Sequence, residues 1–203
     1  MPEPTPDVSR ALERLRAGDP AAAERVFSLL YDELRRIAER VFRSQRPDHT
    51  LQATALVHEA YLKMVDAPGA QDWKDRAHVL AVGVRAMRQV LANHARDAAA
   101  QKRGGGEARA RVTLAGLGAD GGDRAVDAAA FHEALDRLAA LDERQAHIAE
   151  MRLLGGLPTE HVATLLGVSP RTVELDWSMA KRRLSEWLTP PATGAGPVAT
   201  AGA

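Results

Sequence analysis

The segment from Leu157 to Leu188 predicts two short helices joined by a tight turn. It reads Leu-Pro-Thr-Glu-His-Val-Ala-Thr-Leu-Leu-Gly-Val-Ser-Pro-Arg-Thr-Val-Glu-Leu-Asp-Trp-Ser-Met-Ala-Lys-Arg-Arg-Leu-Ser-Glu-Trp-Leu. Thr159 is expected to cap the first helix, and Gly167 supplies the left-handed backbone that such a turn often needs. Ser169 is then a favourable N-cap for the second helix, with Pro170 at the first helical position. These features predict a helix-turn-helix.

The second helix of this segment has an apolar face and a polar face. Its apolar residues recur at steps of four, three and four and so share one stripe: Val173, Trp177, Ala180 and Leu184. The residues on the opposite side, with Glu174 and Lys181 at its edges, are Arg171, Leu175, Ser178 and Arg182. Such side chains can contact guanine, phosphate, cytosine and the thymine methyl in a major groove. The face therefore predicts DNA binding; the alternative is an ordinary helical hairpin with a solvated charged face.

The composition favours an all-helical protein. Only 4% of the 203 residues are aromatic, and the formal net charge is zero, so a nucleic-acid surface must be a local patch. The chain has no cysteine, which excludes disulfides and thiol chemistry and is typical of a reducing cytoplasm. No apolar run approaches the roughly 20 residues of a membrane span, so membrane insertion is not expected.

Long helical patterns occupy the N-terminal half. After a short helix at 8–17, apolar residues recur with helical spacing over 20–44, 52–65 and 75–99. The outward residues of the last of these helices include Arg85, Arg88, Gln89, Asn93 and Arg96. Between Arg85 and Arg111 there are seven basic residues and two acidic ones, a surplus that suits phosphate binding. A solvated face at a domain edge is the alternative.

A glycine-rich segment separates these helices from the C-terminal ones. Residues 104–126 contain seven glycines and predict a flexible linker. Further helices are expected over 127–141 and 142–154, before the helix-turn-helix, and residues 189–203 predict a disordered tail. We therefore expect an all-α chain with two small helical domains, 8–103 and 127–188.

No arrangement typical of an enzyme is found. The pairs His58-Glu59 and His132-Glu133 begin like a zinc-protease motif, but neither is followed three residues later by the second histidine. The three glycines at 104–106 lack the lysine and hydroxyl residue that end a phosphate-binding loop, and no signature groups a catalytic triad. The sequence thus predicts no catalytic residue, no metal site and no cofactor.

Three motifs lie along the chain. The first is Thr-Ala-Leu-Val-His-Glu-Ala-Tyr-Leu at 54–62. The second is Trp-Lys-Asp-Arg-Ala-His at 73–78, followed by Arg-Ala-Met-Arg at 85–88 and His-Ala-Arg at 94–96. The third is Thr-Val at 172–173, with Asp176, Trp177 and Ala180 after it. In this combination the chain resembles bacterial sigma factors of the extracytoplasmic-function (ECF) group, from about Val8 to Leu188.

This resemblance implies a transcription initiation factor that binds core RNA polymerase and directs it to promoters. The N-terminal module would correspond to region 2 of such factors. Its helix around 56–63 would dock on the clamp helices of the largest polymerase subunit. The polymerase-binding residues so implied are His58, Glu59, Leu62 and Lys63.

The resemblance also implies promoter contacts in both modules. Region 2 would read and open the −10 element with Trp73, Arg85, Arg88, Gln89, Asn93 and Arg96. The C-terminal module would correspond to region 4, sit on the polymerase flap and read the −35 element. Its DNA-binding residues would be Ser169, Arg171, Thr172, Glu174, Leu175, Ser178, Lys181 and Arg182. Val79 and Leu80 replace a pair that is often aromatic in this group, and we expect them to pack rather than stack on bases.

Two other functions remain open. A helix-turn-helix regulator with an N-terminal sensing or partner-binding domain would bind its operator without polymerase. A helical enzyme would need a site that the sequence does not show. The sigma-factor interpretation implies core polymerase and promoter DNA as partners, an anti-sigma factor as a further candidate, and a cytoplasmic location.

Overall fold

The computed structural model describes residues 6–19, 21–43, 52–67, 72–101, 111–118 and 121–189. The helices in these ranges are α1 (Pro6–Arg16), α2 (Ala22–Val41), α3 (Ala53–Asp66), α4 (Arg76–Gln101), α5 (Ala128–Leu141), α6 (Glu143–Leu153), α7 (Thr159–Leu166) and α8 (Pro170–Leu188). The strands are β1 (Arg111–Leu114) and β2 (Arg124–Asp127). The predicted all-α class is confirmed. Within the described ranges, no helix combines the length and the apolar character needed to cross a bilayer.

Some predictions fall outside these ranges. The sequence also predicts a helix break at 46–48, and the resemblance implies a promoter-opening loop over 66–73. Residues 46–48 and 68–71 lie outside the described ranges, as do Lys102, Arg103 and Arg109 of the basic stretch and the tail from 190 onward.

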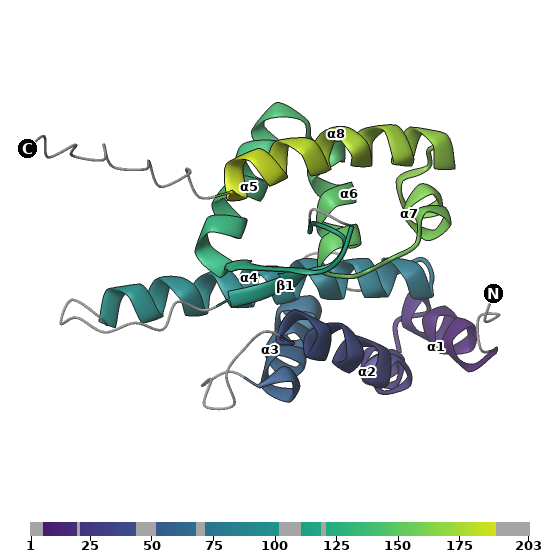
Figure 1. Cartoon of the computed structure of the whole chain (residues 1–203). Coiled ribbons are helices and arrows are strands. Elements are labelled where there is room, and N and C mark those ends of the chain that lie inside the picture. The colour runs from purple at the N-terminus through teal and green to yellow at the C-terminus, as the bar shows by residue number, and fades with distance from the viewer. Residues whose placement is uncertain are drawn as a thin grey trace, which may run out of the picture.

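Helix α4 is the central element of the molecule. It contacts α2 and α3 on one side and α5, α6 and α7 on the other, so that α1–α3 lie below it and α5–α8 above it in Figure 1. One continuous hydrophobic cluster includes buried residues of both groups of helices. Val79 and Leu80 on α4 are buried in it, which confirms that they pack inside the protein.

Part of the segment predicted as a flexible linker is folded. β1 and β2 pair antiparallel, with Val112 opposite Val126, and both of these side chains are buried. The Ala115 backbone N–H donates to the Leu153 carbonyl at 3.0 Å, which ties the hairpin to α6. Glycine content alone predicted flexibility, but the few apolar residues between the glycines bury enough surface to order the hairpin.

The local geometry of the helix-turn-helix follows its sequence closely. Gly167 has φ +65° at the end of α7, and the Ser169 hydroxyl accepts from the Thr172 N–H at 3.1 Å, with Pro170 at the first position of α8. The prediction for Thr159 was wrong. Pro158 is the N-cap of α7 and has no side-chain cap bond, because the Thr159 hydroxyl instead contacts Arg152 and Glu174.

Candidate functional site

The outer face of α8 is exposed as the sequence predicts. Val173, Ala180 and Leu184 are buried and Trp177 is partly buried. The exposed residues are Ser169, Arg171, Glu174, Leu175, Ser178 and Arg182, while Thr172 and Lys181 are half-buried. Leu175 is 59% exposed, which is unusual for a leucine on a helix that is otherwise well packed. The exposed side chains of α8 are of the kinds that can contact base edges and phosphates in a major groove.

A buried carboxylate that the sequence analysis missed holds α8 in place. Asp176 is buried, and the Arg144 Nε on α6 donates to its Oδ2 at 2.7 Å. The hydrogen bond and the charge of Asp176 together raise the pKa of Arg144. Spacing could have revealed this residue, because Asp176 comes three positions after Val173 and four before Ala180 on the buried stripe.

Glu174 lies at the edge of the α8 surface and has partners of its own. Its carboxylate accepts from Thr159 and from Arg152 Nη1, the latter at 3.0 Å. The Thr159 hydrogen bond and then the Arg152 guanidinium lower the pKa of Glu174. The carboxylate is therefore ionised and held against the α6–α7 turn, and a contact with cytosine would require these bonds to rearrange.

Two of the six predicted −10 residues are not on a free surface. Trp73 is 2% exposed, so the prediction that it contacts DNA is corrected: the indole packs in the core. Arg88 is 18% exposed, and its guanidinium is bound by groups on α5 and α6. Trp73 precedes α4 and packs in the core, whereas Arg88 lies on α4 and is covered by α5 and α6 in this arrangement. In both cases tertiary packing, which local sequence spacing does not show, decides whether the side chain is exposed.

The other predicted −10 residues form a polar face on α4. Arg85, Gln89 and Arg96 are exposed and Asn93 is half-buried. Arg96 Nη2 donates to the Asn93 Oδ1 at 2.6 Å, which orients the Asn93 amide. This α4 face offers amide and guanidinium groups that can hydrogen-bond to bases or phosphates.

The predicted polymerase-binding residues lie together on α3. His58 is exposed, Leu62 is 58% exposed, and Glu59 and Lys63 are half-buried. The His94 ring on α4 contacts the Glu59 carboxylate at 3.1 Å, which fixes that carboxylate against the neighbouring helix. The α3 face thus combines one exposed apolar side chain with charged groups, as protein interfaces commonly do.

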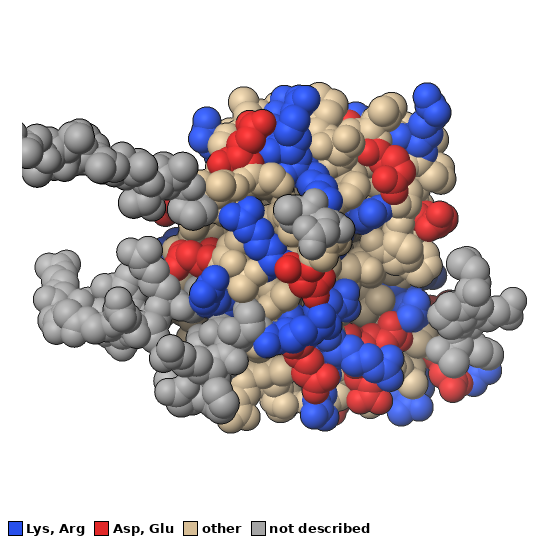
Figure 2. Space-filling view, viewed as in Figure 1, with Lys and Arg blue, Asp and Glu red and all other residues tan. Residues whose placement is uncertain are grey.

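Charges of both signs are interspersed over the visible face of the molecule (Figure 2). This agrees with the zero formal net charge of the sequence. On this side of the described residues, a nucleic-acid contact would therefore be made by a particular helix face, because no broad basic surface is visible there.

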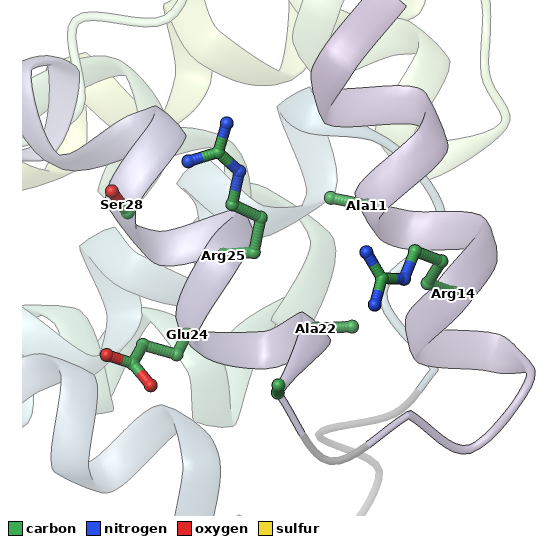
Figure 3. A pocket seen from close by; sticks show the side chains of 7 residues that line it. Ala11, Arg14, Ala22, Glu24, Arg25 and Ser28 are labelled. Atoms are coloured by element: carbon green, nitrogen blue, oxygen red, sulfur yellow. The ribbon is translucent and has the colours of Figure 1, made fainter.

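Two hollows lie on the described part of the molecule. The first has a volume of about 390 Å³ between α1 and α2 and is lined by Ala11, Arg14, Ala21, Ala22, Glu24, Arg25 and Ser28 (Figure 3). Its charged groups do not converge: Arg14 is bound to Asp19 at 2.6 Å, and the Arg25 and Glu24 side chains point in different directions. The second, of about 540 Å³, lies between the hairpin, α7 and α8 and includes Lys181, Trp177 and Arg152. Arg152 in it is already engaged with Glu174.

The comparisons with known proteins agree with this geometry. A model of the protein family described as "ECF sigma factor" matches residues 5–189 of the chain. That range includes every described helix and both strands. No curated protein matched the chain.

Proposed function

Since the chain belongs to the ECF sigma factor family, whose members give RNA polymerase its promoter specificity, we propose that it reads a −35 element with α8 and a −10 element with α4. The observation that carries the proposal is the exposed polar face of α8, presented by a helix-turn-helix with a left-handed glycine and a serine cap. Polymerase would hold both elements at their fixed spacing, in the cytoplasm where it transcribes.

At the −35 element, α8 enters the major groove. Arg171 lies in its first turn and Arg182 three turns later, so each can reach a base edge or a flanking phosphate. Ser169 and Thr172 share a hydroxyl contact of 2.8 Å at the helix start, close to where helix N-termini meet DNA phosphates.

At the −10 element, the α4 face binds the opened strand. Gln89, Asn93 and Arg96 follow one another at steps of four and three residues and therefore share a side of the helix. Unpaired bases expose hydrogen-bonding edges that amides and guanidinium groups can satisfy. Arg85 supplies positive charge along the same helix, and Arg88 would add to it once released from its partners on α5 and α6.

The α3 face is the docking surface for core polymerase. Leu62 is its apolar centre, and His58, Glu59 and Lys63 surround it. Burying the exposed Leu62 side chain against a partner would remove apolar surface from water and so stabilise the complex.

The direct test is co-purification and transcription with core polymerase. The wild-type chain should associate with core enzyme and confer initiation at specific promoters, and by itself it should bind duplex DNA weakly at physiological salt because it has no net charge. Tight binding to an operator by the free chain, without any stimulation of core polymerase, would instead identify a regulator that acts alone.

A matched pair of variants tests the docking surface. Leu62→Asp should weaken association with core polymerase by about tenfold or more. The control is Leu141→Asp on α5, because the two leucines are 58% and 61% exposed and only Leu62 lies on the α3 face. Equal loss of association in both variants would remove α3 from the proposed interface.

A further inference from the structure

A cluster of polar side chains joins α4 to α5 and α6. Arg88 on α4 donates from Nε to Glu150 on α6 at 2.6 Å, and from Nη1 to Asp136 on α5 at 3.1 Å. The same Nη1 lies 2.8 Å from Nδ1 of His132, also on α5. These four residues, Arg88, His132, Asp136 and Glu150, are called the Arg88 cluster below.

Glu150 is the most deeply placed member of the cluster. Its side chain is 6% exposed, which is rare for a carboxylate unless a cation pairs with it. The cations that bind it are Arg88 and, at 3.9 Å, Arg85. Both arginines lie on α4, so α4 neutralises the buried charge of Glu150 on α6. The pairing of Glu150 therefore depends on α5–α8 staying packed against the N-terminal group of helices, α1–α4.

Close backbone contacts accompany the Arg88 cluster. A Cβ added at Gly155, after α6, would lie 3.0 Å from Val84 on α4, and one at Gly156 would lie 1.6 Å from the guanidinium of Arg40 on α2. The absence of side chains at these two positions is what lets the α6–α7 turn approach α2 and α4. Arg43, in the turn after α2, also binds Asp123, beside β2, at 2.6 Å.

This closed arrangement is too small for the proposed promoter contacts. The −10 and −35 elements are about 25 base pairs apart, which corresponds to about 85 Å of duplex at 3.4 Å per base pair. A compact chain of 203 residues has a radius of gyration of about 17 Å and is therefore about 40 Å across. The α4 and α8 faces cannot reach both elements until the two groups of helices separate.

We propose that the free chain is self-inhibited by this contact, with Glu150 holding Arg88, a residue of the proposed −10 surface, until the helices α5–α8 move away from α4. That this contact inhibits promoter binding rests on the proposed function, whereas the closed state and its dependence on Glu150 do not. Opening transfers Arg88 from Glu150 to DNA phosphates or bases, so the same guanidinium serves both states.

The test measures the distance between the two groups of helices in the full chain. Because the chain has no cysteine, Glu13→Cys on α1 and Thr164→Cys on α7 give two unique, exposed sites for spin labels. The labelled chain should show one short distance population. Adding Glu150→Gln removes the buried charge and should increase the open fraction about tenfold or more, seen as a longer population.

A matched control separates opening from general loss of stability. Asp176→Asn also removes a poorly exposed carboxylate paired with an arginine, but Arg144 and Asp176 are both within the C-terminal helices. Asp176→Asn should therefore leave the distance between the two spin labels unchanged. Asp136→Asn, at a side chain that is 58% exposed, should open the chain less than Glu150→Gln and keeps the test valid if the latter does not fold, as judged by circular dichroism.

The outcomes distinguish the inference from the proposed function. If the open variants also bind core polymerase more tightly, by the same factor as the open fraction rises, both are supported. If they open but neither they nor the parent chain binds polymerase, the closed contact stands and the proposed function fails. If the parent chain already shows the long population, or if folded Glu150→Gln and Asp136→Asn chains keep the short one, self-inhibition is overturned.

Discussion

Ser169 determines where α8 begins and therefore how the exposed face of α8 is positioned. Its hydroxyl satisfies the Thr172 N–H at 3.1 Å, one of the backbone donors that a helix start leaves without an intrahelical partner. The turn before it depends on Gly167, the residue with φ +65°. A change at Ser169 therefore acts on a defined hydrogen bond without touching the hydrophobic core.

Ser169→Ala is expected to destabilise the chain by about 0.5–2 kcal/mol through loss of the N-cap. Chemical denaturation followed by circular dichroism would measure the change. Ser28→Ala is the control, because Ser28 is exposed within α2 and alanine is a better helix former there. If the two variants were equally stable, the hydroxyl of Ser169 would have no capping role.

Single residues show which predictions the sequence could support. Gly167, Ser169 and Pro170 were predicted correctly because their partners lie within a few residues along the chain. Trp73 and Arg88 were predicted to face DNA, but one is buried in the core and the other is bound to Glu150, 62 positions away. Helical spacing identifies the sides of a helix; it does not identify which neighbour will cover each side.

At the level of elements, α8 provides two arginines with different expected roles. Arg171 is in the first turn, where recognition helices reach base edges, whereas Arg182 is farther along. Their contributions to promoter recognition can be separated by which promoters and salt conditions each variant affects, rather than by how much activity each variant loses.

Arg171→Ala is expected to cost about 1–3 kcal/mol at promoters that carry one particular −35 base and to relax the preference at that position. Arg182→Ala should weaken all promoters alike and reduce the dependence of binding on salt. Transcription from a library of −35 variants at several salt concentrations would measure both. Unchanged preference and unchanged salt dependence in both variants would place this face away from DNA.

The α4 face makes a different prediction. Gln89→Ala combined with Asn93→Ala should reduce initiation on duplex promoters and recover part of it on a template with a pre-opened bubble, because the bubble removes an unstacking cost of a few kcal/mol. Association with polymerase should persist, since the proposed docking residues lie on α3. An equal defect on both templates would exclude a role in opening.

The hairpin is the element that the sequence did not predict. Its strands have four residues each and lie among glycines, so neither shows a period long enough to stand out from a loop. The helices, with their long apolar stripes, were all predicted to within a few residues at each end. The length of a repeating pattern, rather than the stability of the element, decided what could be predicted.

At the scale of the whole molecule, the Arg88 cluster couples closure to pH. Arginine can only donate, so the 2.8 Å contact of Arg88 Nη1 with His132 Nδ1 requires that nitrogen to be unprotonated. Burial is the main cause that lowers the pKa of His132 below its ordinary 6.5, and Arg88 and Arg96 act in the same direction, against Asp136 and Glu150. The His132 ring is therefore neutral in the closed state.

His147 on α6 behaves in the same way. Burial lowers its pKa, and Arg85 and Arg88 of α4 lower it further, against Glu143 and Glu150. For both histidines the closed state binds fewer protons than an open state with ordinary pKa values. Their contribution to closure is therefore fully present above the ordinary pKa of 6.5 and is reduced as the pH falls below it.

The open fraction is thus expected to be larger at about pH 5.5 than at about pH 7.5, as measured by the same spin-label distances. His132→Gln combined with His147→Gln should flatten this response, because glutamine does not titrate. A distance distribution that does not change between these pH values in the parent chain would show that the two rings do not control closure.

The hairpin also sets how much tether lies between the two groups of helices. Because Arg111 is paired directly with Asp127, the chain between them doubles back and adds only about 5 Å of end-to-end length. The same segment, fully extended, would span about 55 Å. While the strands are paired, the short tether keeps α5–α8 at a high effective concentration near α4, so weak contacts suffice to hold them. If the strands unpaired, the segment from Arg111 to Asp127 could extend. The α8 face could then contact DNA farther from α4.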